Sequence, residues 1–135
     1  MAGEQALSAH RKYVVGIGCR KNTSYSHIRY AVENVFKKHN IKMNEVITFV
    51  SVDLKAGEKF LLKFVHDNKQ EIKFYPVELL DKIIVPNPSE TVENKIGISS
   101  VCEAAALFFC ADKGKLIQPK LKFTDVTVAI CKIFV

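Results

Sequence analysis

Residues 12–52, KYVVGIGCRKNTSYSHIRYAVENVFKKHNIKMNEVITFVSV, contain the pattern from which the fold class follows. The apolar and β-branched residues of Lys12–Cys19 predict a strand, and Val46–Val52 predicts a second strand that is apolar enough to be central in a sheet. Between them, Ser24 opens a predicted helix. Its apolar residues recur at helical spacing, and cations follow at its negative end (Ile28, Ala31, Val32, Val35 and Phe36, then Lys37, Lys38 and His39). A strand, a helix and a strand in this order predict a right-handed crossover between parallel strands.

The same alternation continues after the second strand. Gly57–Asp67 predicts a second helix with one apolar face, and Ile72–Tyr75 predicts a short third strand. Pro76 then begins a short helix at Val77–Lys82, which the segment Pro86-Asn87-Pro88 breaks.

The last third of the chain predicts two helix starts and a hairpin. Asn87-Pro88-Ser89-Glu90 has the composition of a helix start, with Asn87 as the N-cap and Glu90 as its reciprocal partner. Ser100 and Glu103 have the spacing of a capping box, opening a buried helix that runs to about Cys110. Two extended runs follow and are separated by Thr124-Asp125, which is a hairpin signal (Lys115–Phe123 and Val126–Phe134).

These elements predict an α/β fold. We expect a three-layer α/β/α sandwich with a mixed, mostly parallel sheet of about five strands and a C-terminal antiparallel hairpin. The domain is expected to span residues 12–135, and residues 1–11 are expected to form a flexible leader or a linker remnant. A chain of 135 residues, 48% of them apolar, suits one domain with a core of its own.

The net charge of +6 is compatible with a solvated surface, an acidic small ligand or nucleic acid. The chain has no dense Lys/Arg run and no RNA-binding or zinc-finger motif, so we predict no nucleic-acid partner. Residues 1–12 lack the apolar core of a secretion signal. The longest nearly apolar stretch, residues 101–111, is shorter than the roughly 20 residues that cross a bilayer. We therefore expect a soluble, cytoplasmic protein that does not bind membranes.

Cysteine and histidine spacing gives no indication of a metal site. The four cysteines contain no CxxC pair, and the four histidines are scattered singly (Cys19, Cys102, Cys110 and Cys131; His10, His27, His39 and His66). We predict no protein-bound metal and no cofactor, and expect the last three cysteines to be small buried hydrophobic residues.

The loop after the first strand, Cys19–Ser24, is the main candidate site. It combines Arg20 and Lys21 with a helix N-terminus, an arrangement that favours a carboxylate or a phosphate. Cys19, Arg20, Lys21, Thr23 and Ser24 are therefore candidate ligand-binding residues, and the alternative is a solvated basic turn with Ser24 as an ordinary cap. The basic surroundings would lower the pKa of the Cys19 thiol, which makes Cys19 a candidate nucleophile, although no partner base can be named.

Three further segments are expected at the same edge, because ligands of open parallel sheets bind beyond the carboxyl ends of the strands. Asp53 and Lys55 follow the second strand, and Asp53 is a candidate acceptor or base, or a structural cap. The helix starts supply the other candidate ligand-binding residues, whose alternative role is capping (Asn87, Ser89, Glu90 and Ser100). Glu90 is also a candidate catalytic acid.

Gly16-Ile17-Gly18 is a weak match to a dinucleotide-binding fingerprint. The third glycine of that fingerprint would fall at Lys21, and a Walker loop is absent. We expect these glycines to permit close packing of another element on the strand.

Five segments, in this order and spacing, resemble the cobalamin-biosynthesis family of the CbiG C-terminal domain and CobE. The resemblance covers about Tyr13 to Lys132. The departures are Ser26 and His27, where the family often has acidic residues, and Cys102 in place of a usual alanine. The matching segments are VGIGCRK at 15–21, SVDLK at 51–55, PNPSE at 86–90, SVCEAAAL at 100–107 and VTVAI at 126–130.

The resemblance implies a role at the ring-contraction stage of corrin synthesis. Full-length CbiG proteins resemble the enzyme that opens the lactone of cobalt-precorrin-5A and releases acetaldehyde, and they carry N-terminal and central regions that this sequence lacks. CobE-like proteins resemble the C-terminal domain alone. The implied ligand is a corrin or precorrin intermediate, with cobalt only as part of that substrate. The implied partners are the missing CbiG regions or other corrin-pathway enzymes.

The cationic loop fits this implication, because precorrin intermediates carry several acetate and propionate groups. Arg20, Lys21 and Lys55, with nearby helix N-termini, would bind such carboxylates by charge-assisted hydrogen bonds. Two alternatives stay open, namely a small nucleotide-binding α/β module and a non-catalytic interaction domain.

Overall fold

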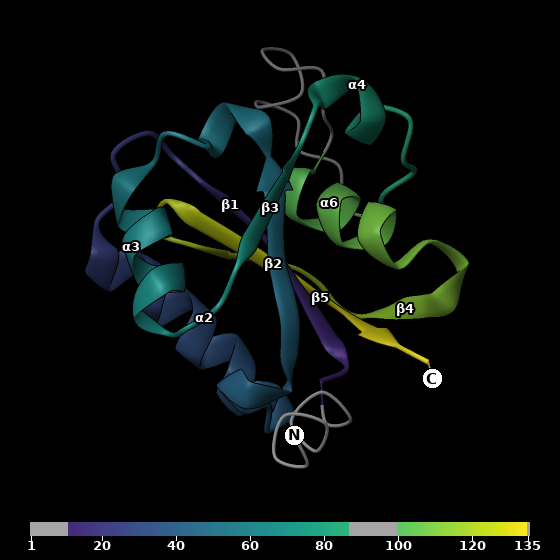
Figure 1. Ribbon diagram of the computed structural model, residues 1–135, viewed down its shortest axis with the longest axis horizontal. Coiled ribbons are helices and arrows are strands. Elements are labelled where there is room, and N and C mark those ends of the chain that lie inside the picture. The colour runs from purple at the N-terminus through teal and green to yellow at the C-terminus, as the bar shows by residue number, and fades with distance from the viewer. Residues whose placement is uncertain (1–10, 87–99, 135) are drawn as a thin grey trace.

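The computed structural model describes residues 11–86 and 100–134, which form one five-stranded sheet covered by helices on both faces (Figure 1). The strands are β1 (Tyr13–Cys19), β2 (Val46–Val52), β3 (Ile72–Tyr75), β4 (Gly114–Phe123) and β5 (Val126–Ile133). The helices are α2 (Tyr25–His39), α3 (Lys59–Asp67), α4 (Val77–Leu80) and α6 (Val101–Cys110). Short 3-10 turns lie at Met43–Glu45, Asp53–Lys55 and Ala111–Lys113.

The strand order is β3-β2-β1-β5-β4. β1 pairs in parallel with β2, and β2 pairs in parallel with β3. β5 pairs antiparallel with both β1 and β4, so four strands run in one direction and β5 runs against them. The predicted mixed sheet with a C-terminal hairpin is confirmed, and β1 lies at its centre.

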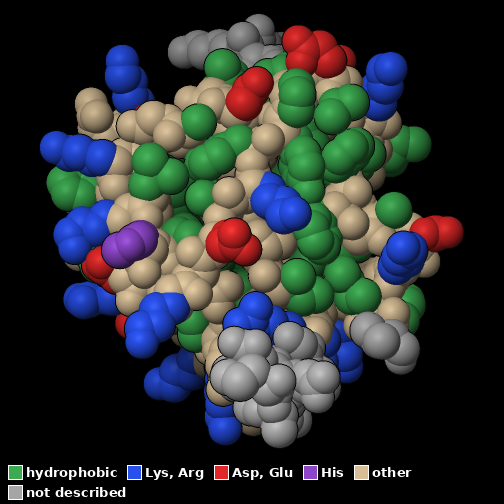
Figure 2. Space-filling view, in the orientation of Figure 1, with side chains coloured by type: hydrophobic (Ala, Val, Ile, Leu, Met, Phe, Trp, Pro, Cys, Tyr) green, Lys and Arg blue, Asp and Glu red, His purple; other side chains and the backbone are tan. Residues whose placement is uncertain are grey.

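The two faces of the sheet are packed by different helices. α2 and α3 cover one face, where their buried residues contact Val15 and Ile17 of β1. α6 and α4 cover the other face, which includes Val14 of β1. Hydrophobic side chains gather over α4, α6 and β3 in Figure 2, where the rings of Tyr75 and Phe108 lie 4.7 Å apart. The three-layer arrangement is therefore the predicted one.

The glycines of β1 let α6 approach the sheet closely. A Cβ atom added at Gly16 would lie 1.9 Å from the carbonyl oxygen of Cys102, and one added at Gly18 would lie 2.8 Å from Oγ1 of Thr127. The facing turn of α6 is also built from small residues, Ala104–Ala106, all fully buried. The expected close packing is confirmed at Gly16, whereas a Cβ atom at Gly18 would first meet a side chain of the neighbouring strand β5.

The start of α2 follows the prediction, because Ser24 is its N-cap and accepts a hydrogen bond from the amide of His27. α2 ends at Asn40, which has the left-handed conformation common at helix ends (φ 55°). The second predicted helix begins two residues later than Gly57, and the short helix after Pro76 ends at Leu80. The predicted helix start at residues 87–90 lies outside the described residues.

The start of α6 differs from the prediction. Ser100 is the N-cap, but its side chain makes no capping hydrogen bond, and its hydroxyl lies 3.8 Å from the sulfur of Cys102. Glu103 is fully buried and accepts a hydrogen bond from the amide of Lys120 at 2.8 Å. Pairing of β4 with β5 is irregular around Pro119, so the neighbouring amide of Lys120 is available to Glu103. The predicted capping box is therefore wrong.

Within residues 11–86 and 100–134, no helix has the length and apolar composition needed to cross a membrane.

Candidate functional site

The C-terminal ends of β1 and β2, the start of β5 and the start of α6 meet at one edge of the sheet. The amide of Arg20, just after β1, donates to the carbonyl oxygen of Asp125 in the β4–β5 turn at 2.9 Å. The amide of Asn22 donates to Oε1 of Glu58, just before α3, at 2.8 Å. A Cβ atom at Gly18 would lie 3.6 Å from Cβ of Val101, the first residue of α6. The predicted convergence of these segments is therefore present.

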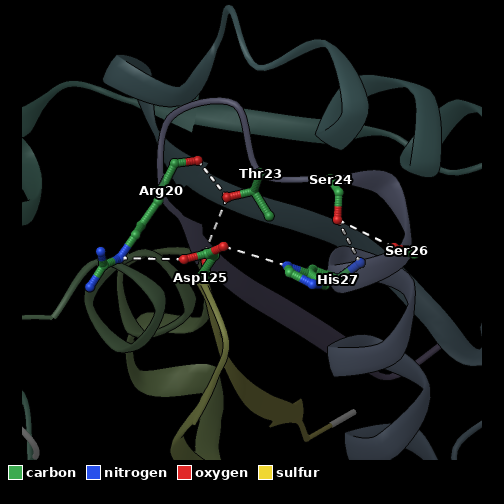
Figure 3. A network of polar contacts seen from close by, with 6 residues as sticks. All are labelled: Arg20, Thr23, Ser24, Ser26, His27 and Asp125. Atoms are coloured by element: carbon green, nitrogen blue, oxygen red, sulfur yellow. Dashed lines mark hydrogen bonds and ion pairs between the residues drawn. The ribbon is translucent and has the colours of Figure 1, made fainter.

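The side chain of Asp125 organises this edge (Figure 3). Its Oδ1 lies 3.6 Å from Nε of Arg20, and its Oδ2 lies 3.4 Å from Nδ1 of His27. Asp125 has φ 64°, a left-handed conformation that aspartate tolerates better than most residues. One carboxylate thus faces an arginine and a histidine from two other segments.

Nε of Arg20 lies against Asp125, and the outer part of its guanidinium is exposed to solvent. Its side chain is 83% exposed, and Figure 3 shows the outer nitrogens of its guanidinium pointing away from Asp125. Lys21 is also exposed. The loop therefore presents cationic groups to solvent directly before the N-terminus of α2, a location that favours anions.

Thr23 and Ser24 shape the loop. The hydroxyl of Thr23 donates to the carbonyl oxygen of Arg20 at 2.6 Å, and the side chain is buried. Ser24 Oγ caps α2 and lies 3.3 Å from Oγ of Ser26. The hydroxyls of both residues thus have partners inside the protein, and the predicted ligand contacts stay predictions.

Cys19 does not have the acidified thiol that the sequence suggested. Burial raises the pKa of the Cys19 thiol to about 11, although Lys55 acts in the opposite direction. Glu58 raises this pKa further, and the hydrogen bond with Thr23 lowers it. The expectation failed because the side chain is only 8% exposed, so desolvation outweighs the basic neighbours.

The second loop contributes Asp53 and Lys55, which lie in the 3-10 turn after β2. Asp53 is exposed and Lys55 is partly exposed, and Lys55 is close enough to Cys19 to influence its thiol. Ser100 is buried at the start of α6. Asn87, Ser89 and Glu90 lie outside the described residues.

Three residues of this edge were missed by the sequence analysis: His27, Glu58 and Asp125. Each of them contacts a residue that is distant in the sequence, so no local pattern predicts the contact. Asn22 and Glu58, for instance, are 36 residues apart. Asp125 was recognised only as a turn residue. Among the described residues, no group of three or more His, Cys, Asp or Glu side chains could hold a metal ion.

Taken together, the described part of this edge is suited to binding anions. It offers an exposed guanidinium and an exposed ammonium group directly before the capped N-terminus of α2, and it contains no described pairing of a nucleophile with a base. The Lys and Arg side chains in Figure 2 are dispersed over that face of the molecule and form no continuous stripe.

Comparison with known proteins gives consistent matches. The family described as Cobalamin synthesis G C-terminus matches residues 13–131. The chain is 28% identical over 117 residues to cobalt-precorrin-5A hydrolase of Priestia megaterium, covering 86% of this chain and 31% of that protein. It is 25% identical over 128 residues to Protein CobE of a Sinorhizobium species, covering 93% and 83%.

The fold has a solved counterpart. The crystal structure of CobE, a protein from the cobalamin (vitamin B12) biosynthetic pathway, superposes with a TM-score of 0.80 at 24% identity, covering 91% of both chains. The chain thus spans most of the length of CobE proteins but about a third of the hydrolase.

Proposed function

Because the chain belongs to the Cobalamin synthesis G C-terminus family, we propose that it acts in cobalamin biosynthesis by binding a corrin intermediate through that intermediate's carboxylate groups. The exposed Arg20, held at the sheet edge by Asp125, is the observation that carries this proposal. Corrin precursors carry several acetate and propionate side chains. A guanidinium can bind such a carboxylate through two parallel hydrogen bonds.

The names of the relatives support one particular intermediate as the ligand. The hydrolase of Priestia megaterium is named for cobalt-precorrin-5A, and this chain matches 31% of its length. We therefore propose that the domain contributes to opening the cobalt-precorrin-5A lactone together with further regions or partner enzymes, or has an accessory role like that of CobE. The high pKa of the Cys19 thiol argues against Cys19 as a nucleophile.

The glycine arrangement supports corrin binding over nucleotide binding. Gly16 and Gly18 lie inside β1 and face α6 and Thr127, so their backbone is occupied by packing. In a dinucleotide site the glycines lie in the turn after the strand, where the backbone approaches the pyrophosphate. The nucleotide-binding alternative therefore loses its glycine motif and keeps only Asp53, which follows β2.

The test is a spectroscopic titration with hydrogenobyrinic acid, a cobalt-free corrin polycarboxylate. We expect the visible spectrum of the corrin to change on addition of protein, and the coloured ligand to stay with the protein on a desalting column. An unchanged spectrum together with complete separation on the column would contradict the proposal. Parallel thermal-shift measurements with NAD and ATP should give no stabilisation, whereas a shift with either would favour the nucleotide alternative.

A further inference from the structure

The backbone amide of Asn22, in the middle of the basic loop, already binds a carboxylate. Its N–H donates to Oε1 of Glu58 at 2.8 Å, and the contact lies at the surface. Glu58 is the residue from which α3 begins, and its side chain makes no capping hydrogen bond within that helix. The contact therefore links the loop after β1 to the loop after β2.

The Glu58 carboxylate forms no ion pair among the described residues, although several cations lie in the neighbouring loops. Arg20 and Lys21 directly precede Asn22 in the sequence, and Lys55 and Glu58 both lie near the Cys19 thiol. Nevertheless, among the ion pairs of the described residues Glu58 has none within 4.0 Å. A carboxylate bound by a neutral amide at the surface exchanges readily, because water replaces such a contact at little cost.

We infer that the amide of Asn22 is a carboxylate subsite in the same loop as Arg20, and that Glu58 fills this subsite in the free protein. The inference rests on the proposed function and names how the same site selects its ligand. A corrin carboxylate replaces Glu58 at the amide, while another carboxylate of the same molecule reaches the guanidinium of Arg20.

The built-in carboxylate makes the site selective for ligands with several acidic groups. A monocarboxylate exchanges one amide contact for another and gains little. A polycarboxylate displaces Glu58 and also gains charge-assisted contacts at Arg20 and Lys21. Only such a ligand therefore gains net binding free energy when it replaces Glu58. Glu58 thus acts as a competitor that lowers the affinity for simple acids.

Dissociation constants for hydrogenobyrinic acid test the inference in three variants. Glu58→Ala removes the competitor, and we expect binding about three- to fivefold tighter than wild type, the upper range for an exposed charged contact. Glu58→Gln keeps an oxygen that accepts from the amide but loses the charge, so its effect should be intermediate. Glu33→Gln, on the exposed face of α2, changes the net charge equally and should leave the affinity unchanged.

Each outcome decides a different point. Equal or weaker binding by Glu58→Ala, with wild type binding and the circular dichroism unchanged, overturns the inference and leaves the proposed function standing. Tighter binding by Glu58→Ala than by wild type, with Glu33→Gln equal to wild type, supports the inference. Absence of binding in both proteins overturns the inference and the proposed function together.

Discussion

The two faces of the central sheet are packed in opposite ways. On the face covered by α2 and α3, large side chains such as Ile28 and Phe49 fill the space between helix and sheet. On the face covered by α6, the backbone of the helix lies directly against Gly16. The first face can adjust through side-chain rotamers, whereas the second has backbone against backbone and cannot. Sensitivity to a single added carbon should therefore differ strongly between them.

Gly16→Ala should have the largest effect. The new Cβ would lie 1.9 Å from the carbonyl oxygen of Cys102, so α6 must move away from β1. We expect a loss of about 3 kcal/mol or more in the free energy of unfolding, the upper part of the range for overpacking a core. Urea denaturation measures this loss. Gly57→Ala is the matched control, since no atom lies within 4 Å of its added Cβ, and it should cost almost nothing. Similar stabilities of the two variants would contradict the close packing of α6.

Glu103→Ala should have the next largest effect, on the same face. It removes the buried acceptor of the Lys120 amide, and leaving such a donor unsatisfied costs about 1–3 kcal/mol. Glu103→Gln keeps an oxygen acceptor and should recover part of this loss. Hydrogen exchange at the Lys120 amide, followed by NMR, should accelerate in the alanine variant. Unchanged exchange would show that this amide does not depend on Glu103.

Ile28→Val tests the other face with a change of one carbon. Ile28 is fully buried on α2, and its truncation should cost about 0.5–1.5 kcal/mol. Thermal unfolding of this variant beside Gly16→Ala compares one carbon removed with one carbon added. If Ile28→Val proves the more damaging, the two faces are not packed as differently as described.

Arg20→Ala should have the smallest effect on stability, since an exposed ion pair contributes little. Its effect should appear instead in binding of hydrogenobyrinic acid, with a loss of about 1.5–3 kcal/mol, the range for a hydrogen bond to a charged group. Arg20→Lys should also weaken binding if the contact is bidentate. Lys122→Ala, which removes an exposed charge on β4, is the control for net charge. Equal binding by Arg20→Ala and wild type would move the site away from this loop.

The sequence predicted what depends on local pattern. The apolar, β-branched runs of β1 and β2, the helical spacing in α2 and the cap at Ser24 each involve residues a few positions apart, and all are found as expected. Even the glycines of β1 could be interpreted correctly, because glycine inside a strand has few uses other than close approach.

What the sequence could not predict depends on partners far along the chain. Glu103 has the spacing of a cap, yet its partner is an amide on β4, 17 residues away, exposed by irregular pairing around Pro119. Arg20 was expected to face a ligand, but its neighbour Asp125 comes from the opposite end of the domain. The thiol of Cys19 was expected to be acidic because its basic neighbours are visible in sequence, whereas its burial is not.

The position of β5 has a consequence for how the chain folds as it is synthesised. β5 is the last strand in sequence, yet it pairs along the whole of β1, from Tyr13 with Lys132 to Cys19 with Val126. While the ribosome is still making β4, one edge of β1 therefore has unpaired backbone groups, and such an edge can pair with another chain. Contacts between such distant segments also close slowly. The nascent domain thus has an unpaired strand edge at the centre of its sheet until β5 emerges.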